Sequence, residues 1–298
     1  MQEYYQLDHI DILSYFLASL LHDVGHPGLN NSYQQNKQTK LALKYNDKSI
    51  LENYHSYKGL RLFTKNSSDI LEFLSADEKK IFRKRFISCI FATDMAYHSS
   101  VLSNIASKID KINAAIETEN QNSNKNNNNL AGASKEDQNI SKKYNGFALE
   151  ETDEKHLLSQ KRIKKFFEID IDGENLNNQK NIKFELQQDF LNLLVHSSDV
   201  SNPSKDLTVY SIWTKLVMQE FFNQGELEKS ENLPVSYLCD RVTTNVPKSQ
   251  VGFINFIVAP LFKTISFYLP SVSIFEENVK RNLDYFKSIE EFDIEYHI

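Results

Sequence analysis

Apolar residues recur every three or four positions along most of this chain, and this spacing constrains the fold more than any other feature. Residues three and four apart share one face of a helix, so the spacing predicts amphipathic helices over 10–21, about 68–92, about 184–198, 213–222 and about 249–268. We find no alternation of period two, which strands would require. The small numbers of Gly (8) and Pro (6), beside 20 Phe and 14 Tyr, agree with an all-α fold.

Two places interrupt this helical pattern. Pro260 lies within the last pattern and should bend or divide it, because proline lacks the N–H that an inner helical residue donates. The stretch at about 113–181 is rich in Asn, Lys, Glu and Gln, with too few apolar residues to offset the entropy of ordering. We expect a long disordered or loosely helical insertion there, with a short helix at 163–171, inside one domain that covers 1–298.

Charge and cysteine content limit the partners. The formal charge of −6 and the absence of a long basic run argue against a nucleic-acid surface. An anionic small substrate stays compatible if metal ions supply positive charge. Cys89 and Cys239 form no metal-spaced pair and are expected to be reduced thiols of an intracellular protein. Because no segment has about 20 apolar residues and the N-terminus lacks a signal peptide, we expect a soluble cytoplasmic domain with no membrane segment.

Two pairs of polar residues stand at the ends of apolar helical patterns. His22 and Asp23 end the first pattern, and an imidazole with a neighbouring carboxylate can bind one metal ion. His196 and Asp199 end the pattern at about 184–198, where a buried carboxylate is costly unless it is paired or metal-bound. Each pair alone also fits an ordinary role, as a surface His-Asp pair or as a helix-ending histidine followed by a turn-forming aspartate.

Taken together, several segments resemble the class I 3′,5′-cyclic nucleotide phosphodiesterases. The stretch 22–30, His-Asp-Val-Gly-His-Pro-Gly-Leu-Asn, resembles the second metal motif of that family. Segments similar to later family motifs follow in order at 41–47, 49–55, 92–98, 196–205 and 248–254. The resemblance implies a compact all-α multi-helix bundle of the HD metal-hydrolase type, here a phosphodiesterase catalytic domain interrupted by the insertion.

The resemblance also implies which residues hold metal and water. His22, Asp23 and Asp199 would bind the tighter ion, expected to be Zn²⁺, and Asp23 would reach a second ion, expected to be Mg²⁺ or Mn²⁺. A hydroxide shared by the two ions would attack phosphorus, as in other two-metal sites. The residues implied to orient metal-bound water are His26, Glu52, Thr93 and Asp94. Helix capping or ordinary surface hydrogen bonding is the alternative role of those four.

The same resemblance implies a nucleotide site. Gln250 would hold the purine edge, and Phe253, three residues on and therefore on the same face, would stack on one side of the base. Val217 would close the other side, and the remaining residues implied to line the base end are Asn202, Tyr210, Thr214 and Phe221. Without the resemblance, the apolar residues of this set would be assigned to the core and Gln250 to the surface.

Three departures from the family pattern matter. Family members carry a His-Asn-x-x-His motif upstream that supplies a general acid and one more metal histidine. The residues before His22 contain His9 alone, in surroundings unlike that motif, so we expect His9 at the surface and a chain that begins downstream of the motif. Gly25 stands where many members have an acid, and Tyr54 replaces the first of two histidines.

The leading hypothesis is hydrolysis of a 3′,5′-cyclic nucleotide to the 5′-monophosphate. Asn202-Pro203 after Val200-Ser201 is more similar to members that prefer cAMP than to those that prefer cGMP. One alternative is a catalytically impaired relative that binds a nucleotide or a partner protein for regulation. Another is an HD-type hydrolase of other phosphates, against which Gln250 and Phe253 count. The sequence does not indicate an oligomeric state.

Overall fold

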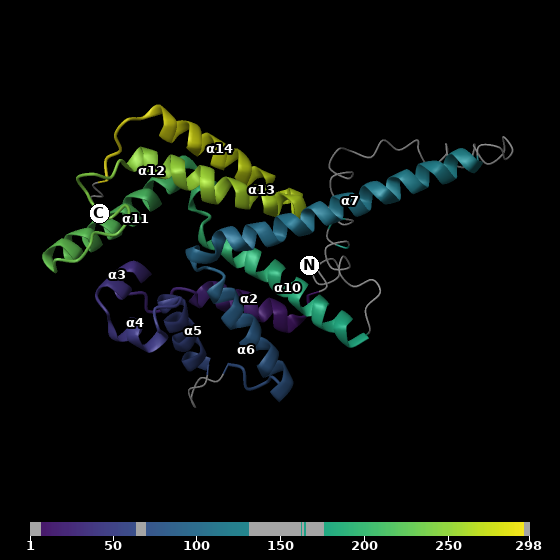
Figure 1. Cartoon of the computed structure of the whole chain (residues 1–298), viewed down its shortest axis with the longest axis horizontal. Coiled ribbons are helices and arrows are strands. Elements are labelled where there is room, and N and C mark those ends of the chain that lie inside the picture. The colour runs from purple at the N-terminus through teal and green to yellow at the C-terminus, as the bar shows by residue number, and fades with distance from the viewer. Residues whose placement is uncertain (1–6, 64–69, 131–161, 163, 165–175, 295–298) are drawn as a thin grey trace.

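The computed structural model describes residues 7–63, 70–130, 162, 164 and 176–294. These residues form helices and no strand, so the all-α prediction is confirmed (Figure 1). The helices are α2 (His9–Leu21), α3 (Asn31–Asn36), α4 (Lys40–Tyr45), α5 (Ile50–Phe63), α6 (Ala76–Phe91), α7 (His98–Leu130), α10 (Leu176–Asp199), α11 (Leu207–Ser230), α12 (Val246–Phe253), α13 (Ala259–Tyr268) and α14 (Ser273–Ser288). Shorter turns are η1 (Met95–Tyr97), η2 (Asn202–Ser204), η3 (Ile254–Val258) and η4 (Pro270–Val272).

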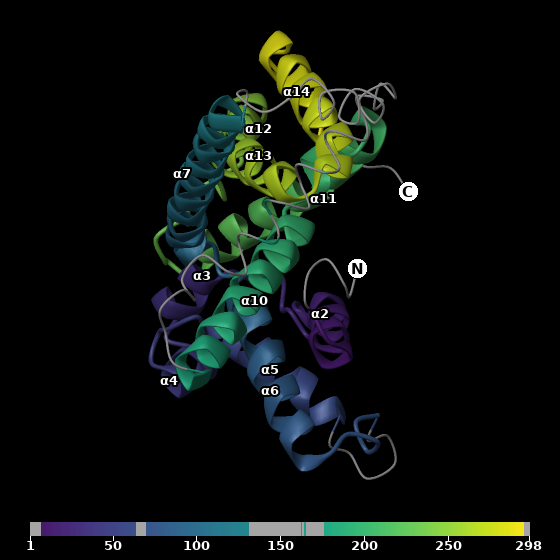
Figure 2. The same ribbon diagram turned by 90° about the vertical axis from the view of Figure 1, so that its right-hand side faces the viewer.

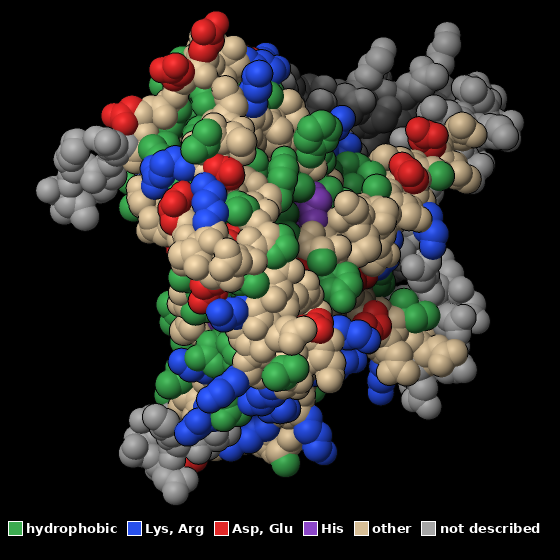
Figure 3. Space-filling view, turned by 60° about the vertical axis from the view of Figure 1, so that its left-hand side comes forward, with side chains coloured by type: hydrophobic (Ala, Val, Ile, Leu, Met, Phe, Trp, Pro, Cys, Tyr) green, Lys and Arg blue, Asp and Glu red, His purple; other side chains and the backbone are tan. Residues whose placement is uncertain are grey.

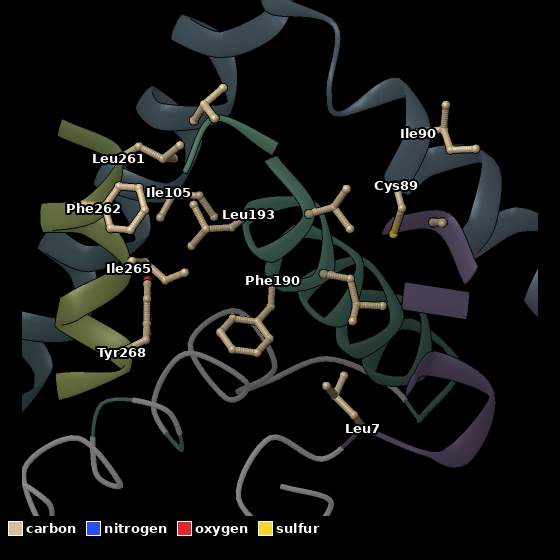
Figure 4. Packing of buried hydrophobic residues seen from close by; sticks show 14 of the residues in the cluster. Leu7, Cys89, Ile90, Ile105, Phe190, Leu193, Leu261, Phe262, Ile265 and Tyr268 are labelled. Carbon is tan, nitrogen blue, oxygen red and sulfur yellow. The ribbon is translucent and has the colours of Figure 1, made fainter. Parts of the chain in front are cut away.

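Helix α10 lies in the middle of the molecule. It contacts α2 and α6 on one side and α13 and α7 on the other (Figures 1 and 2). Phe190 and Leu193 of this helix point toward Leu261, Phe262 and Ile265 of α13 in the core (Figure 4). Helix α10 therefore packs on both groups of helices and joins them.

A buried arginine ties α2, α6 and α10 together. The Arg85 side chain on α6 donates from Nε to Asp11 Oδ1 on α2 at 2.8 Å. It also donates from Nη1 to the Phe184 carbonyl at 2.7 Å and from Nη2 to Gln187 Oε1 at 2.9 Å, both on α10. A buried charge is tolerated only with such a complete set of partners. The ion pair therefore fixes the relative positions of the three helices.

Pro260 is accommodated by a widened turn just before it, and the helix that it was expected to bend or divide stays continuous. Helix α12 passes into the π turn η3, in which the Ala259 N–H donates to the Ile254 carbonyl five residues earlier. Pro260 follows in the first turn of α13, where its missing N–H is tolerated. The three elements together form one continuous helical run with a wider turn in its middle.

This run, Val246–Tyr268, is 23 residues long and apolar enough to cross a membrane by length and composition. The expectation that no segment approaches this limit is therefore wrong. Ile254, Val258 and Leu261 of the run are buried in the main core, however. Packing inside the domain thus accounts for part of its apolar character, with 33% of its most apolar window buried.

The helices on both sides of the expected insertion extend into it. Helix α7 continues to Leu130 and α10 begins at Leu176, and Ile116 still packs against the core. Arg162 lies over the Phe267 ring of α13, with its guanidinium carbon 4.2 Å from the ring centre. Residues 131–161 and most of the expected helix at 163–171 lie outside the described residues.

Candidate metal and nucleotide site

His22, the first residue after α2, faces two carboxylates. Its Nε2 lies 3.3 Å from Asp23 Oδ2 and 3.1 Å from Asp199 Oδ1, at the end of α10. Its Nδ1 donates to the Ser19 carbonyl at 2.9 Å. The three ligand atoms lie within 4.8 Å of one another, so the structure brings the predicted metal ligands together. A histidine whose Nδ1 is tied to a backbone carbonyl presents Nε2 as the ligand atom, as metal-binding histidines do.

The electrostatics of this trio favour a positive charge between the carboxylates. Burial lowers the pKa of His22, but hydrogen bonds to Asp199 and Asp23 and the charges of both outweigh burial and raise the pKa to about 11. Burial raises the pKa of Asp23, but the hydrogen bond to His22 and the charges of His22, His26 and His55 together outweigh burial, so the net shift is downward. The proton held between these groups occupies the place that a divalent ion would take. The donor set, one imidazole and two carboxylates, fits zinc and also harder ions.

A second histidine faces the other oxygen of Asp23. His55 on α5 donates from Nδ1 to the Val24 carbonyl at 3.0 Å, and its Nε2 lies 3.7 Å from Asp23 Oδ1. Burial lowers the pKa of His55, so the ring is neutral and Nε2 is an acceptor. The predicted His26 stacks on this ring at 5.7 Å and accepts the Gly28 N–H at its own Nδ1. Two acceptors 3.7 Å apart leave room for a bridging cation or water.

Glu52 lies close enough to both Asp94 and Asp23 for their charges to interact with its own. Burial raises the pKa of Glu52, and the charges of Asp94 and Asp23 raise it further, against the amide of Asn31. That amide donates to both Glu52 oxygens, at 3.3 and 3.0 Å. Asp94 accepts the Ser49 hydroxyl at 2.7 Å. The two predicted acids therefore belong to the surroundings of the metal candidates.

Thr93 is placed differently from the other residues predicted to orient water. Its hydroxyl donates to the Ile90 carbonyl at 2.8 Å, a bond that ends helix α6. The ordinary capping role considered for this residue is thus present in the structure. A hydroxyl can still accept a further hydrogen bond through its oxygen while it donates this one.

A cavity of about 360 Å³ opens beside the trio. Its walls include His22, Asp23 and Asp199 together with Asn202 and Trp213. The cavity therefore connects the metal candidates to the first of the residues predicted to bind the nucleotide. The other six predicted residues lie on α11 and α12, namely Tyr210, Thr214, Val217, Phe221, Gln250 and Phe253.

Gln250 is buried, not at the surface, and its amide is oriented by a neighbour. The Tyr210 hydroxyl donates to Gln250 Oε1 at 2.7 Å, which joins α11 to α12. Gln250 Nε2 lies 3.4 Å from Ser249 Oγ. Burial raises the pKa of Tyr210, and the hydroxyl of Thr214, one turn further along α11, partly offsets the rise. The phenol is thus a hydrogen-bond donor at neutral pH.

The three apolar residues of the predicted nucleotide site are half-buried. Phe253 packs against the main core, as the alternative assignment from sequence has it. Phe221 packs against a small cluster of Met218, Phe222 and Val246. Val217 lies one turn before Phe221 on α11. Phe253 and Phe221 therefore have packing roles, and all three residues retain an accessible part.

Lys58 fills the space next to Gly25. A side chain at Gly25 would place its Cβ 2.6 Å from Lys58 Nζ, and the glycine has a φ of +75°. The same ammonium lies over the Tyr54 ring at 4.9 Å. Where many family members have an acid, this chain therefore combines a glycine, a lysine and a tyrosine. The sequence alone did not predict that the replacements at Gly25 and Tyr54 share a contact with one lysine.

His196 does not join the site. Its Nε2 lies 2.8 Å from His98 Nδ1 in the interior, and burial lowers its pKa to about 4. Its partner in the sequence, Asp199, faces His22 instead. His9 is exposed, as predicted, with Nε2 3.3 Å from Glu78.

Asn31 and His55 were missed as site residues. His55 lies three residues after Glu52 and therefore on the same face of α5, a spacing that could have indicated it. The contact of Asn31 with Glu52 joins two helices, and no sequence pattern indicates it.

Comparison with known proteins places this arrangement in a family. The sequence model of the 3′5′-cyclic nucleotide phosphodiesterases matches residues 1–279. The 3′,5′-cyclic-AMP phosphodiesterase 4C of Rattus norvegicus is 31% identical over 255 residues, which are 86% of this chain and 37% of that protein. The 3′,5′-cyclic-AMP phosphodiesterase, isoform F, of Drosophila melanogaster is 29% identical over 273 residues, 91% of this chain and 32% of that protein.

Solved structures agree with this placement. The phosphodiesterase domain of the RhoPDE fusion protein from the choanoflagellate Salpingoeca rosetta superposes with a TM-score of 0.66 at 26% identity. The match covers 95% of this chain and 69% of that domain. The chain spans about a third of the length of the curated relatives it matches. On the family match, this chain belongs to the 3′,5′-cyclic nucleotide phosphodiesterases.

Proposed function

We propose that this chain hydrolyses a 3′,5′-cyclic nucleotide, with cAMP favoured over cGMP, to the 5′-monophosphate. The observation that carries the proposal is the position of His22 between Asp23 and Asp199, beside a cavity of about 360 Å³ that leads to Asn202. Divalent ions held by these residues, which we propose to be zinc with magnesium or manganese, would place positive charge against the phosphate and activate water.

The residues around the trio would position the water molecules. Glu52, fixed by the Asn31 amide, and Asp94, fixed by the Ser49 hydroxyl, can each accept a hydrogen bond from water. His26 would act from the ring that stacks on His55, and Thr93 through its free lone pair. These four residues therefore orient the nucleophile and do not themselves bond to phosphorus.

The amide of Gln250 supports a preference for adenine. Adenine presents a donor, its N6 amino group, beside an acceptor, N7, whereas guanine presents two acceptors, O6 and N7. In the orientation in which the Tyr210 hydroxyl donates to Gln250 Oε1, the amide offers an acceptor beside a donor. We propose that this orientation is kept in the complex, where it matches the N6 and N7 edge of adenine and not the O6 and N7 edge of guanine. Phe253 and Val217 would cover the two faces of the base, and Thr214 and Phe221 would line its end.

Turnover assays with cAMP and cGMP, at matched zinc and magnesium concentrations, test the proposal. Asp199→Asn should remove bound metal and turnover while the helical content is kept. Gln250→Ala should retain metal but weaken nucleotide binding by about one to two orders of magnitude, the cost of unpaired polar groups. Tyr210→Phe should lower the cAMP-to-cGMP ratio. A protein that binds metal and nucleotide without turnover would instead be a nucleotide-binding regulatory module.

A further inference from the structure

A second cavity, which we call the α13 cavity, lies between the C-terminal part of α10, the turn η2 and the helices α13 and α14. Its volume is about 270 Å³, and four serines and Lys205 form its polar lining. Its apolar walls are Leu194, Phe262, Ile265, Leu269, Val272 and Phe275. Cavities that hold drug-sized ligands usually measure about 300–1,000 Å³, so the α13 cavity suits a small, largely apolar ligand.

A lysine supplies the charge of the α13 cavity. Of the described residues that line it, Lys205 alone is charged. The Lys205 ammonium lies 5.6 Å from the centre of the Phe275 ring, which in turn stands edge-on to Phe262 with centroids 6.0 Å apart. No carboxylate of the described residues forms an ion pair with Lys205, and an aromatic face attracts a cation without neutralising it. A positive charge therefore lies beside the apolar wall.

The turn that carries Lys205 is held by two asparagines of α14. Asn282 Nδ2 donates to the Pro203 carbonyl at 2.8 Å and to the Lys205 carbonyl at 2.9 Å. Asn278 Nδ2 donates to the Ser204 carbonyl at 3.0 Å. These hydrogen bonds fix the backbone at Lys205 before any ligand binds. A fixed backbone lowers the entropy that binding costs.

The serines of the α13 cavity differ in what they offer a ligand. The hydroxyls of Ser197, Ser198 and Ser204 donate to carbonyls of their own turns, at 2.6, 2.8 and 2.7 Å. They therefore present acceptor oxygens to the cavity. The Ser201 hydroxyl donates to none of the residues that the structure describes. Ser201 and Lys205, both in the segment around η2, thus supply two donors, which suits the two acceptor oxygens of a carboxylate.

We propose that the α13 cavity binds an amphipathic monocarboxylate, such as a short fatty acid. The carboxylate would accept hydrogen bonds from Lys205 and Ser201, and the aliphatic chain would lie against the apolar wall of α13. Each buried methylene contributes about fourfold to affinity. A phosphate ion would satisfy Lys205 but would offer nothing to the six apolar side chains, and an uncharged lipid would leave the lysine without an anion.

The α13 cavity is a neighbour of the cavity beside the metal candidates. Ser198, Ser201 and Lys205 line both, so they form a shared wall, whereas His22 and Asp199 line the first cavity alone among the described linings. The proposed ligand needs neither a metal ion nor turnover. Its binding can therefore be tested independently of the proposed function.

Titration calorimetry with octanoate, in the absence of added metal, tests the proposal. Octanoate should bind, whereas acetate, which lacks the apolar chain, and octanol, which lacks the charge, should each bind at least about tenfold more weakly. Lys205→Gln should weaken octanoate binding by about tenfold, the lower end for a hydrogen bond between charged groups, and Lys205→Arg should largely retain binding. Val272→Phe should also weaken binding, because the larger side chain fills part of the cavity.

The controls separate this cavity from other places where an anion can bind. Anions are also attracted to the Lys and Arg side chains that gather at the lower end of the view in Figure 3 (Figure 3). Lys263→Gln is the matched control, since it removes the same charge from an exposed position on α13. Asp199→Asn changes the first cavity and not the α13 cavity. Both control variants should bind octanoate at least as tightly as the unmodified chain.

Several outcomes would overturn the proposal. Equal losses in Lys205→Gln and Lys263→Gln would mean that only total charge matters, and a loss in Asp199→Asn would place the ligand in the first cavity. Acetate that binds as tightly as octanoate would remove the role of the apolar wall. Unchanged octanoate affinity in both Lys205→Gln and Val272→Phe would exclude the cavity altogether. Lys205 is exposed, so its replacement should leave the fold intact, which circular dichroism checks.

Discussion

At the scale of single residues, the proton on His22 should control metal binding. The pKa of this histidine is about 11 in the fold and 6.5 in its ordinary state. Its stabilising contribution is therefore fully present below pH 6.5 and is lost as the pH rises through about 11. A metal ion must displace the same proton, so affinity should rise over that window.

We predict that zinc binding near neutral pH releases about one proton from His22. Titration calorimetry in two buffers of different ionisation enthalpy measures the number released. His22→Ala should bind zinc more weakly and release fewer protons. If the wild-type heat were the same in both buffers, the assignment of Nε2 as the ligand atom would fail.

A second residue-scale prediction concerns the buried pair of His98 and His196. Burial lowers the pKa of His196 to about 4, so the unfolded chain binds the proton first as pH falls. Stability should be lost between pH 6.5 and about 4, by an amount on the order of 3 kcal/mol. Urea unfolding at several pH values tests this, with His196→Gln as the variant that should flatten the dependence. An unchanged pH profile in that variant would assign the loss to other groups.

The sequence could identify the site residues that lie next to each other or at the end of an apolar helical pattern. His22-Asp23 and Asp199 end apolar helical patterns, and the structure brings them together. The Lys58–Gly25 contact and the Asn31–Glu52 hydrogen bond join different elements, so they cannot be predicted from the pattern of residues within one segment. The roles assigned to these residues stay predictions until metal and nucleotide are measured.

At the scale of elements, two glycines on helices make a matched test of backbone packing. A Cβ at Gly225 of α11 would lie 1.8 Å from the Cys239 carbonyl oxygen, whereas a Cβ at Gly252 of α12 meets nothing within 4 Å. Gly225→Ala should therefore destabilise the fold by about 3 kcal/mol or more. Gly252→Ala should stabilise it by up to about 1 kcal/mol, the difference in helix propensity. The midpoints of urea unfolding of the two variants test this prediction. Equal midpoints would mean that α11 can move away from the segment that contains Cys239.

The presence of the helices could be predicted from the spacing of apolar residues, but the way in which a helix is interrupted could not. Pro260 predicts an irregularity in its helix. Whether that irregularity is a π turn depends on which backbone carbonyls accept hydrogen bonds in the folded protein. The polar composition after residue 113 also gave no indication that α7 continues into that stretch. Ile109, Ile112 and Ile116 keep helical spacing into the Asn-rich stretch, and Ile112 is fully buried. A few well-spaced apolar residues thus outweighed the polar average around them.

At the scale of the whole molecule, Ile116 is the last described residue of α7 that packs against the core, and the side chains described beyond it are exposed. We predict that deletion of residues 120–155 leaves thermal stability and nucleotide binding within error, because their composition offers little to bury. The deletion retains Arg162 and its contact with Phe267. A loss of more than about 2 kcal/mol would show that the deleted segment packs on the domain.

The arrangement of α2 and α10 also affects the order in which ligands bind. Both helices end at the metal candidates, since His22 follows the last residue of α2 and Asp199 is the last of α10. The C-terminal end of a helix carries a partial negative charge of about half an electron, so two helix dipoles add to the two carboxylates. A cyclic nucleotide, itself an anion, meets an unfavourable potential there until a cation is bound. Metal binding should therefore precede nucleotide binding, and the empty site should discriminate against free phosphate.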